Sequence, residues 1–234
     1  MVYKDVSKMN KKPKLGATPD FVYEILKANI LNGKYSPGER IKEESIAKEL
    51  NVSRGSVRGA FVRLKDEGLL WGEPYGGVKV REISLKEAID IINIRMLLEK
   101  YVVSQVILRS DATFLKTLES IVLSMEQAAT EKDYELYSHL NTEFHEEIYK
   151  ASGDAVVTDL LIHIKTKIMR TQYKVAFIPG RTQKSIAEHK MILDALKKKD
   201  LTAVTSAIEN HLNSLLRTIV EFNGLLEIRS VKNE

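Results

Sequence analysis

Apolar residues recur at three- and four-residue steps over most of this 234-residue chain. Before residue 65 this spacing predicts three short helices, the first over about 20–32. The pattern then changes, because Leu69–Trp71 and Val78–Val80 are short apolar runs separated by a segment that contains glycine, and this predicts a two-stranded hairpin. From Leu85 onward every apolar run has helical spacing again. The chain is therefore expected to be mostly α-helical, with one small sheet in its N-terminal third.

Residues 39–64 have the pattern of a helix–turn–helix. Asn51 suits the turn because Asn tolerates left-handed backbone angles. Ser53 suits the N-cap of the second helix, since its hydroxyl can accept a hydrogen bond from an unpaired backbone N–H. Apolar residues define one face of each helix: Ile41, Ile46, Ala47 and Leu50 in the first, and Val57, Ala60, Phe61 and Leu64 in the second.

The residues left outside this core are suited to contact with DNA. Arg54, Ser56 and Arg58 lie near the start of the second helix, where a recognition helix meets base edges. Arg can contact guanine through two hydrogen bonds, and Ser can contact bases or phosphates. Gly77 in the hairpin lets the backbone approach a phosphate closely. We therefore expect a winged helix–turn–helix that binds DNA through Ser53, Arg54, Ser56, Arg58 and Gly77; the alternative is a small helical domain with two surface arginines.

Charge and composition agree with this expectation. Residues 1–80 hold 15 Lys and Arg against 10 Asp and Glu, whereas the remainder holds 21 against 22, so the positive excess lies in the predicted DNA-binding part. Residues 1–17 are expected to form a flexible basic tail. The chain has no cysteine, no apolar run of membrane-spanning length and no apolar leader segment, which predicts a cytoplasmic protein without disulfides or thiolate metal sites.

The second part of the chain is expected to be an antiparallel bundle of about six helices, because short connections separate its amphipathic segments. Ser84, Asp111, Asp133 and Asp200 are suited to cap or open four of them. The predicted domains are 18–81 for the winged helix and 84–222 for the bundle, with a C-terminal tail over 223–234. The six helices are expected over about 85–108, 111–130, 133–151, 155–176, 181–198 and 200–222.

Three histidines lie on different helices of this bundle: His145, His189 and His211. Neutral imidazoles that converge from three helices can bind a divalent transition metal. Asn141 lies one turn before His145 on the same helix face. Spacing alone leaves open the commoner alternative, in which each histidine is a satisfied core or surface group. Arg95, in an otherwise apolar helix, is compatible either with an ion pair to a nearby acid or with binding of an anion.

The two halves together resemble the GntR family of bacterial transcription factors, in its FadR-like branch with an all-helical effector domain of the FCD type. The resemblance covers about residues 18–222 and implies a homodimeric regulator, most often a repressor and not an enzyme, that binds a palindromic operator in double-stranded DNA. The residues that carry it in the DNA-binding half are Pro37-Gly38, Ile46-Ala47, Val52-Ser53-Arg54, Val57-Arg58, Leu64, Glu67-Gly68-Leu69 and Gly77.

The resemblance also implies a metal centre and an effector. In many FCD domains an Asp and a His four residues apart join two later histidines around a metal. The matching residues here are Asn141, His145, His189 and His211, so an uncharged Asn stands where the family has a carboxylate. Zinc, nickel and manganese are all compatible with this ligand set. Arg95 would hold the carboxylate of a small organic acid beside the metal.

Two other functions are compatible with the residues. One is a metal-dependent enzyme, in which the histidines activate a water molecule and Glu143, Glu146 or Glu188 acts as the base. The other is a DNA-binding protein whose bundle dimerises but binds no ligand.

Overall fold

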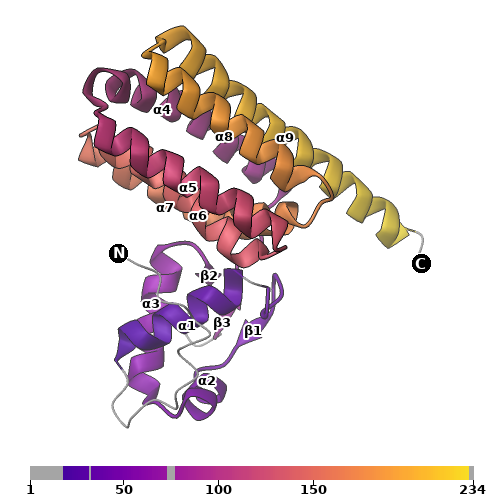
Figure 1. Ribbon diagram of the computed structural model, residues 1–234. Coiled ribbons are helices and arrows are strands. Elements are labelled where there is room, and N and C mark those ends of the chain that lie inside the picture. The colour runs from indigo at the N-terminus through magenta and orange to yellow at the C-terminus, as the bar shows by residue number, and fades with distance from the viewer. Residues whose placement is uncertain (1–17, 32, 73–76, 232–234) are drawn as a thin grey trace. The chain divides into compact units, whose positions relative to one another are not determined.

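The computed structural model describes residues 18–31, 33–72 and 77–231. The chain divides into two compact units after Ile83 (Figure 1), and each is described by itself. The predicted basic tail, the segment 73–76 of the predicted hairpin and residues 232–234 lie outside the described residues.

The N-terminal unit packs three helices against a small antiparallel sheet with strand order β1-β3-β2. The first helix lies against the third, and the buried side chains of α3 include Val57, Ala60, Phe61 and Leu64, as predicted. Gly59 allows close packing of the two helices, because a Cβ there would lie 3.1 Å from Pro19 Cβ. The elements are α1 (Pro19–Leu31), β1 (Arg40–Ile41), α2 (Glu43–Leu50), α3 (Arg54–Asp66), β2 (Leu70–Trp71) and β3 (Val78–Val80).

The turn between α2 and α3 follows the predicted geometry. Asn51 has φ 52° and ψ 50°, which is the left-handed region. Ser53 is extended, and its Oγ accepts a hydrogen bond from Ser56 N at 3.0 Å. One local prediction is wrong: Ile41 belongs to β1 and pairs with Val78, not to the first helix of the motif. A two-residue strand is too short to show the alternation typical of strands. Ile41, its buried residue, happens to continue the helical spacing of the residues that follow.

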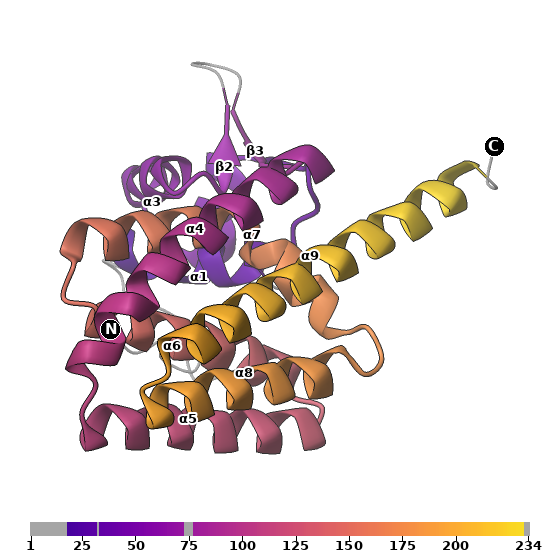
Figure 2. The ribbon, with the colours of Figure 1, turned by 90° about the horizontal axis from the view of Figure 1, so that it is seen from above.

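The described residues of the C-terminal unit form a bundle of six helices. Their packing makes a closed ring (Figures 1 and 2). Around this ring α4 packs on α9, α9 on α8, α8 on α5, α5 on α6, α6 on α7 and α7 on α4. Ser84, Asp111, Asp133 and Asp154 each cap a helix by accepting a backbone N–H. The helices are α4 (Leu85–Arg109), α5 (Ala112–Thr130), α6 (Tyr134–Ala151), α7 (Ala155–Ala176), α8 (Arg181–Lys198) and α9 (Leu201–Val231).

The end of the last helix differs from the prediction. We expected it near Phe222, before Gly224, but α9 continues to Val231 and runs past the other helices of the bundle (Figure 2). A single Gly in a helix costs about 1 kcal/mol relative to Ala, which is not enough to end a long helix. Among the described residues, no helix has the length and apolar character needed to cross a membrane.

Candidate DNA-reading surface and metal centre

The two arginines predicted to read DNA are exposed on α3. Their side chains retain 63% (Arg54) and 68% (Arg58) of their accessible surface. Both are paired with the first turn of α2: Arg54 Nη2 lies 3.0 Å from Glu44 Oε1, and Arg58 donates from Nε and Nη2 to the two oxygens of Glu43 at 3.2 and 3.0 Å. These pairs hold the arginines at the start of the recognition helix without burying them.

The predicted serines lie at the same helix start. Ser56 is half-buried, and its Oγ is 2.9 Å from Ser53 Oγ. Because Ser53 also caps α3, both hydroxyls are engaged with the helix end. The structure therefore gives the two serines a clear role in positioning α3, while their contact with DNA stays a prediction.

The small sheet presents two further basic residues that were not predicted from the sequence. Arg40 on β1 is directly opposite Lys79 on β3, and both are exposed. Like charges opposite each other destabilise a sheet, so an anion beside them would offset a local cost. Gly77 has φ +76°, and a Cβ there would lie 2.9 Å from Arg40 Nε. An anionic ligand such as a DNA phosphate suits this face of the sheet.

Three buried histidines meet inside the helical unit, as the family resemblance implied and as the spacing alone had left open. His145 comes from α6, His189 from α8 and His211 from α9, and none is more than 3% exposed. Each offers a ring nitrogen within 4.8 Å of the others. The Nε2 atoms of His145 and His189 are 3.3 Å apart.

The outer ring nitrogens of these histidines face hydrogen-bond acceptors. His189 Nδ1 lies 2.6 Å from Ser185 O, His211 Nδ1 lies 2.9 Å from Glu188 Oε2, and His145 Nδ1 lies 3.4 Å from Glu99 Oε2. Since a carbonyl or carboxylate oxygen accepts, we assign the proton of each ring to Nδ1. The lone pair of each ring is then on Nε2. Metal-binding histidines are commonly oriented by acceptors in this way.

The electrostatics of the three rings fit a cation. Burial lowers the pKa of His145 to about 3, assisted by the charge of Lys165, and burial lowers the pKa values of His189 and His211 as well. All three imidazoles are therefore neutral near pH 7. Two lone pairs that face each other at 3.3 Å repel unless a cation lies between them. Tetrahedral zinc with Zn–N bonds of about 2.0–2.1 Å would place two ligand nitrogens roughly 3.3–3.4 Å apart, so the observed separation fits such a metal.

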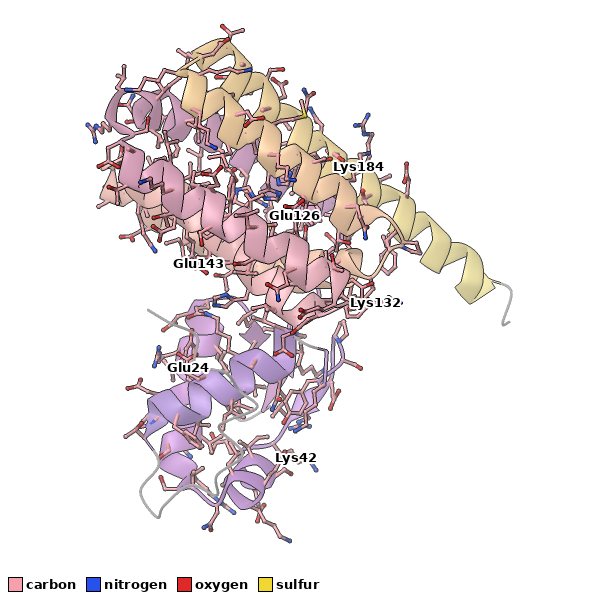
Figure 3. The ribbon with its side chains drawn as sticks, viewed as in Figure 1. Glu24, Lys42, Glu126, Lys132, Glu143 and Lys184 are labelled. Atoms are coloured by element: carbon pink, nitrogen blue, oxygen red, sulfur yellow. The ribbon has the colours of Figure 1, made fainter. Side chains whose placement is uncertain are left out.

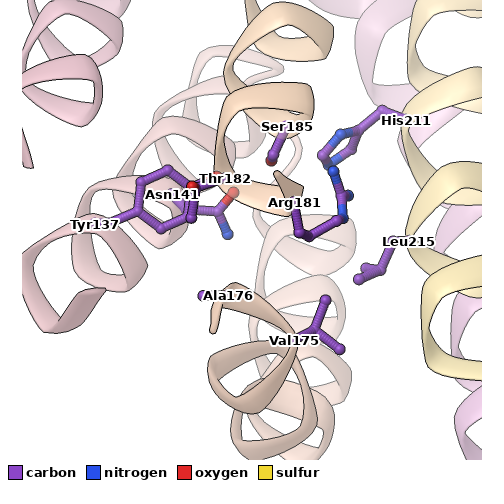
Figure 4. Close-up of a pocket in the computed structure, with 9 residues that line it drawn as sticks. All are labelled: Tyr137, Asn141, Val175, Ala176, Arg181, Thr182, Ser185, His211 and Leu215. Atoms are coloured by element: carbon purple, nitrogen blue, oxygen red, sulfur yellow. The ribbon is translucent and has the colours of Figure 1, made fainter. Parts of the chain in front are cut away.

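A cavity beside His211 brings Asn141 to the same region. It is small and open on one side, and Figure 4 shows Tyr137, Asn141, Thr182 and Ser185 among the residues that line it. Asn141 is half-buried on this wall. Its position is compatible with the predicted role, but its contact with a metal stays a prediction.

Arg181, the first residue of α8, also lines this cavity and was missed from the sequence. Its side chain is 7% exposed, and its Nη1 and Nη2 donate to Glu188 Oε2 at 3.3 and 3.4 Å. A helix N-terminus carries partial positive charge and therefore disfavours a cation. An Arg at the start of a predicted helix was the feature of the sequence that could have indicated a binding site.

Arg95 forms an ion pair in the interior. Its side chain is fully buried, its Nε donates to Glu99 Oε1 at 2.9 Å, and Tyr149 Oη donates to the same oxygen at 2.7 Å. It is not among the residues that line the cavity. The structure thus shows the ion-pair alternative, while the predicted contact of Arg95 with an effector stays untested. A second buried cation, Lys165, donates to Thr142 O at 3.2 Å and was also missed.

Comparison with known proteins identifies the family. The family model for bacterial regulatory proteins of the gntR family matches residues 18–80, and the model for the FCD domain matches residues 90–214. The HTH-type transcriptional regulator YdhC of Bacillus subtilis (strain 168) is 32% identical over 193 residues, which cover 82% of this chain and 86% of that protein. The chain belongs to the GntR family. It is a DNA-binding transcriptional regulator with an FCD domain.

Other GntR regulators share this organisation. The transcriptional repressor RspR of Escherichia coli (strain K12) is 25% identical over 198 residues, covering 85% of this chain and 87% of that protein. The solved structure of E. coli McbR/YncC is similar in fold, with a TM-score of 0.77 and 20% identity, over 89% of this chain and all of that one.

Two of the acidic residues considered as the base of a metal-dependent enzyme, Glu188 and Glu143, are either engaged with other side chains or exposed. Glu188 is bonded to His211 and Arg181, and the side chain of Glu143 is 44% exposed on the outer face of α6 (Figure 3). The relatives compared above are named as regulators of transcription.

Proposed function

We propose that this chain is a repressor whose operator binding responds to a small organic acid, and that the acid binds beside a divalent metal held by the helical unit. The observation that carries the proposal is the convergence of three neutral, buried histidines in a chain that also has a DNA-reading helix. The relative RspR, named as a repressor, supports the sign of regulation.

The metal would be held by His145, His189 and His211, with Asn141 as a candidate fourth group. Imidazole suits zinc, nickel and manganese, and availability in the cell often decides which is bound. A bound metal would act as a Lewis acid toward an oxygen ligand. An Asn carbonyl brings no charge, so we expect weaker binding than with a carboxylate at that position, and room for an oxygen of the effector.

The effector would occupy the cavity beside His211. The wall offers the hydroxyls of Tyr137, Thr182 and Ser185 and the amide of Asn141, which suit the oxygens of a small acid. Arg95 is paired with Glu99 in the interior and is not among the residues that line this cavity, so we expect other side chains on the wall to hold the acid. Acid binding can shift operator affinity only by its difference in affinity for the two DNA-binding arrangements of the protein.

The homodimer would form through the outer face of α4. Ile94, Leu97, Tyr101 and Leu108 are all large, apolar and exposed, and their spacing places them on one side of the helix. Leu97 and Leu108 are 72% and 79% exposed, which is unusual for a row of apolar side chains. Two copies joined here would carry two recognition helices to half-sites of a palindromic operator.

The DNA part of the proposal is tested with arginine variants. In fluorescence anisotropy with a defined operator, Arg54→Ala and Arg58→Ala should each weaken specific binding about 5- to 150-fold, since each lost bidentate base contact costs about 1–3 kcal/mol. Arg217→Ala, an exposed Arg of α9, is the matched control and should bind as wild type. Unchanged operator affinity in both recognition-helix variants, with native circular dichroism, would show that α3 does not read the operator.

The regulatory part is tested by a thermal-shift screen of small carboxylates with and without added Zn²⁺, Ni²⁺ or Mn²⁺. A metal-dependent shift with one acid, followed by loss of operator binding in that acid, is expected. If no metal and no acid changes the melting temperature while DNA binding is intact, the bundle serves dimerisation alone. Leu97→Glu should convert the dimer to a monomer in light scattering, and a dimer that survives this change would place the interface elsewhere.

A further inference from the structure

One carboxylate oxygen in the helical unit is shared by the cavity wall and the histidine cluster. Glu188 Oε2 accepts from His211 Nδ1 at 2.9 Å, and it lies 3.3 and 3.4 Å from Nη1 and Nη2 of Arg181. The carboxylate of Glu188 is therefore shared between His211 and Arg181.

Arg181 has hydrogen-bonding capacity left. A guanidinium has five N–H donors, and among the described residues Arg181 Nε has no acceptor although it is buried. The two contacts with Glu188 are long for charge-assisted hydrogen bonds, which are usually about 2.7–2.9 Å. Figure 4 shows the Arg181 side chain on the cavity wall, directed toward His211. A buried donor without a partner, next to free space, is suited to a ligand that accepts hydrogen bonds.

We propose that Arg181 binds a carboxylate in this cavity, and that Glu188 makes this anion and a metal at the three histidines bind cooperatively. The proposal rests on the metal centre of the proposed function and adds the group that links it to the acid. An anion that occupies the guanidinium competes with Glu188 for Arg181. Glu188 is then free to direct more of its charge to His211.

The direction of the coupling follows from charge. A carboxylate acceptor on Nδ1 increases the basicity of an imidazole toward a metal on its other nitrogen. While Arg181 holds part of the Glu188 charge, that support for His211 is reduced, and the cation of Arg181 itself opposes a second cation nearby. The anion removes both effects, so metal binding tightens. By linkage the metal must tighten anion binding by the same factor.

Arg95 is poorly placed for this role. Its guanidinium is paired with Glu99 in the interior and does not line the cavity. Arg181 differs because it faces free space and shares its acceptor with a histidine of the cluster.

The test is a calorimetric titration of metal-stripped, full-length protein with Zn²⁺ at pH 7.5, in sodium acetate and in sodium perchlorate of equal ionic strength. Acetate is the probe anion. For wild type we expect acetate to tighten zinc binding about fivefold or more, which is the lower range of typical coupling. Arg181→Gln should bind zinc about threefold more tightly than wild type in perchlorate, because a competing cation is gone, and should lose the acetate effect.

Three further variants locate the coupling. Glu188→Gln should weaken zinc binding about 10- to 100-fold, as expected for loss of an orienting acceptor, and should also lose the acetate effect. Arg181→Lys keeps the charge without the fork and should retain part of the effect. Lys184→Gln removes an exposed charge one turn further along α8 (Figure 3) and should match wild type. Circular dichroism establishes that each variant is folded.

The outcomes separate this inference from the proposed function. If folded wild type binds no zinc in either salt, the metal centre of the proposed function fails and the coupling fails with it. If wild type binds zinc equally in both salts, or if folded Arg181→Gln keeps the full acetate effect, the coupling through Arg181 is overturned and the metal centre stands. A full acetate effect in Glu188→Gln would overturn the role of Glu188.

Discussion

Replacing Arg95 tests whether the buried ion pair stabilises the helical unit. The side chains of Arg95 and Glu99 are 0% and 1% exposed, so Arg95→Met leaves an uncompensated carboxylate in the interior. Breaking a buried pair in this way costs about 3–5 kcal/mol of unfolding free energy. Replacing both partners in Arg95→Met/Glu99→Leu removes the stranded charge. The remaining cost is that the Tyr149 hydroxyl and His145 Nδ1 lose the acceptor that faces them, at about 1–3 kcal/mol for each. The loss in the double variant should therefore be smaller than the sum of the losses in Arg95→Met and Glu99→Leu.

The two units can be followed separately in the same urea titration. Trp71, the only tryptophan of the chain, lies on β2, so its fluorescence reports the N-terminal unit, whereas far-ultraviolet circular dichroism is dominated by the six long helices. The protein concentration must be held fixed, because association shifts apparent stability. We expect the fluorescence transition to stay in place in all variants. A double variant that loses the sum of the two single losses would show that the two side chains do not interact, and would refute the reasoning.

Four other changes have defined outcomes. Ser53→Ala should destabilise the N-terminal unit by about 0.5–2 kcal/mol through loss of the N-cap. Ser53→Asp should restore stability in urea titration, yet its negative charge should weaken DNA binding by repulsion. Weak DNA binding by Ser53→Ala together with normal DNA binding by Ser53→Asp would contradict these expectations. Lys79→Ala should reduce the slope of log affinity against log salt by about 1, and an unchanged slope would remove Lys79 from the phosphate contacts. Burial, followed by the charge of Arg95, lowers the pKa of Lys165 to about 7, well below its unfolded value of about 10.4. Between these two values the unfolded chain binds more protons than the folded one, so the free energy of unfolding should rise with pH from about 7 to 10. Lys165→Met should flatten that rise in urea titrations. Gly153→Ala should destabilise the helical unit by about 1–3 kcal/mol, because φ of Gly153 is +71° and a Cβ there would overlap Arg109 Nη1. An unchanged urea midpoint would show that the backbone at 153 and the side chain of Arg109 can both relax.

Most helix starts could be predicted because their signals are local. Ser53, Ser84, Asp111 and Asp133 each accept a backbone N–H within three residues, so the capping side chain and the helix it begins are adjacent in sequence. Strand β1 could not be predicted, since its pairing with β3 is made across nearly forty residues and only two residues take part. The predicted end of α9 was wrong because a single Gly, Gly224, does not cost enough to end a long helix.

The candidate site was predictable in part. The three histidines could be found from residue type and from the family pattern, and the structure brings them together. Their surroundings could not be found in this way. The acceptor of His189 is a backbone carbonyl, which has no sequence signature, and the acceptor of His211 lies on a different helix. The ion pair of Arg95 was one of two open alternatives, because an Arg four residues before a Glu is compatible with either.

Helix α8 carries an unusual share of this interior. Arg181, Ser185, Glu188 and His189 lie within nine consecutive residues of one uninterrupted helix. Each residue added to a helix turns the following side chains by about 100°. A one-residue insertion or deletion between 181 and 189 would therefore turn the cavity residue Arg181 and the orienting acceptors away from the metal-binding His189. The connections on either side of α8 have no such constraint. In the descent of such regulators, this stretch should tolerate substitutions of outward-facing residues such as Lys184 but no change in length.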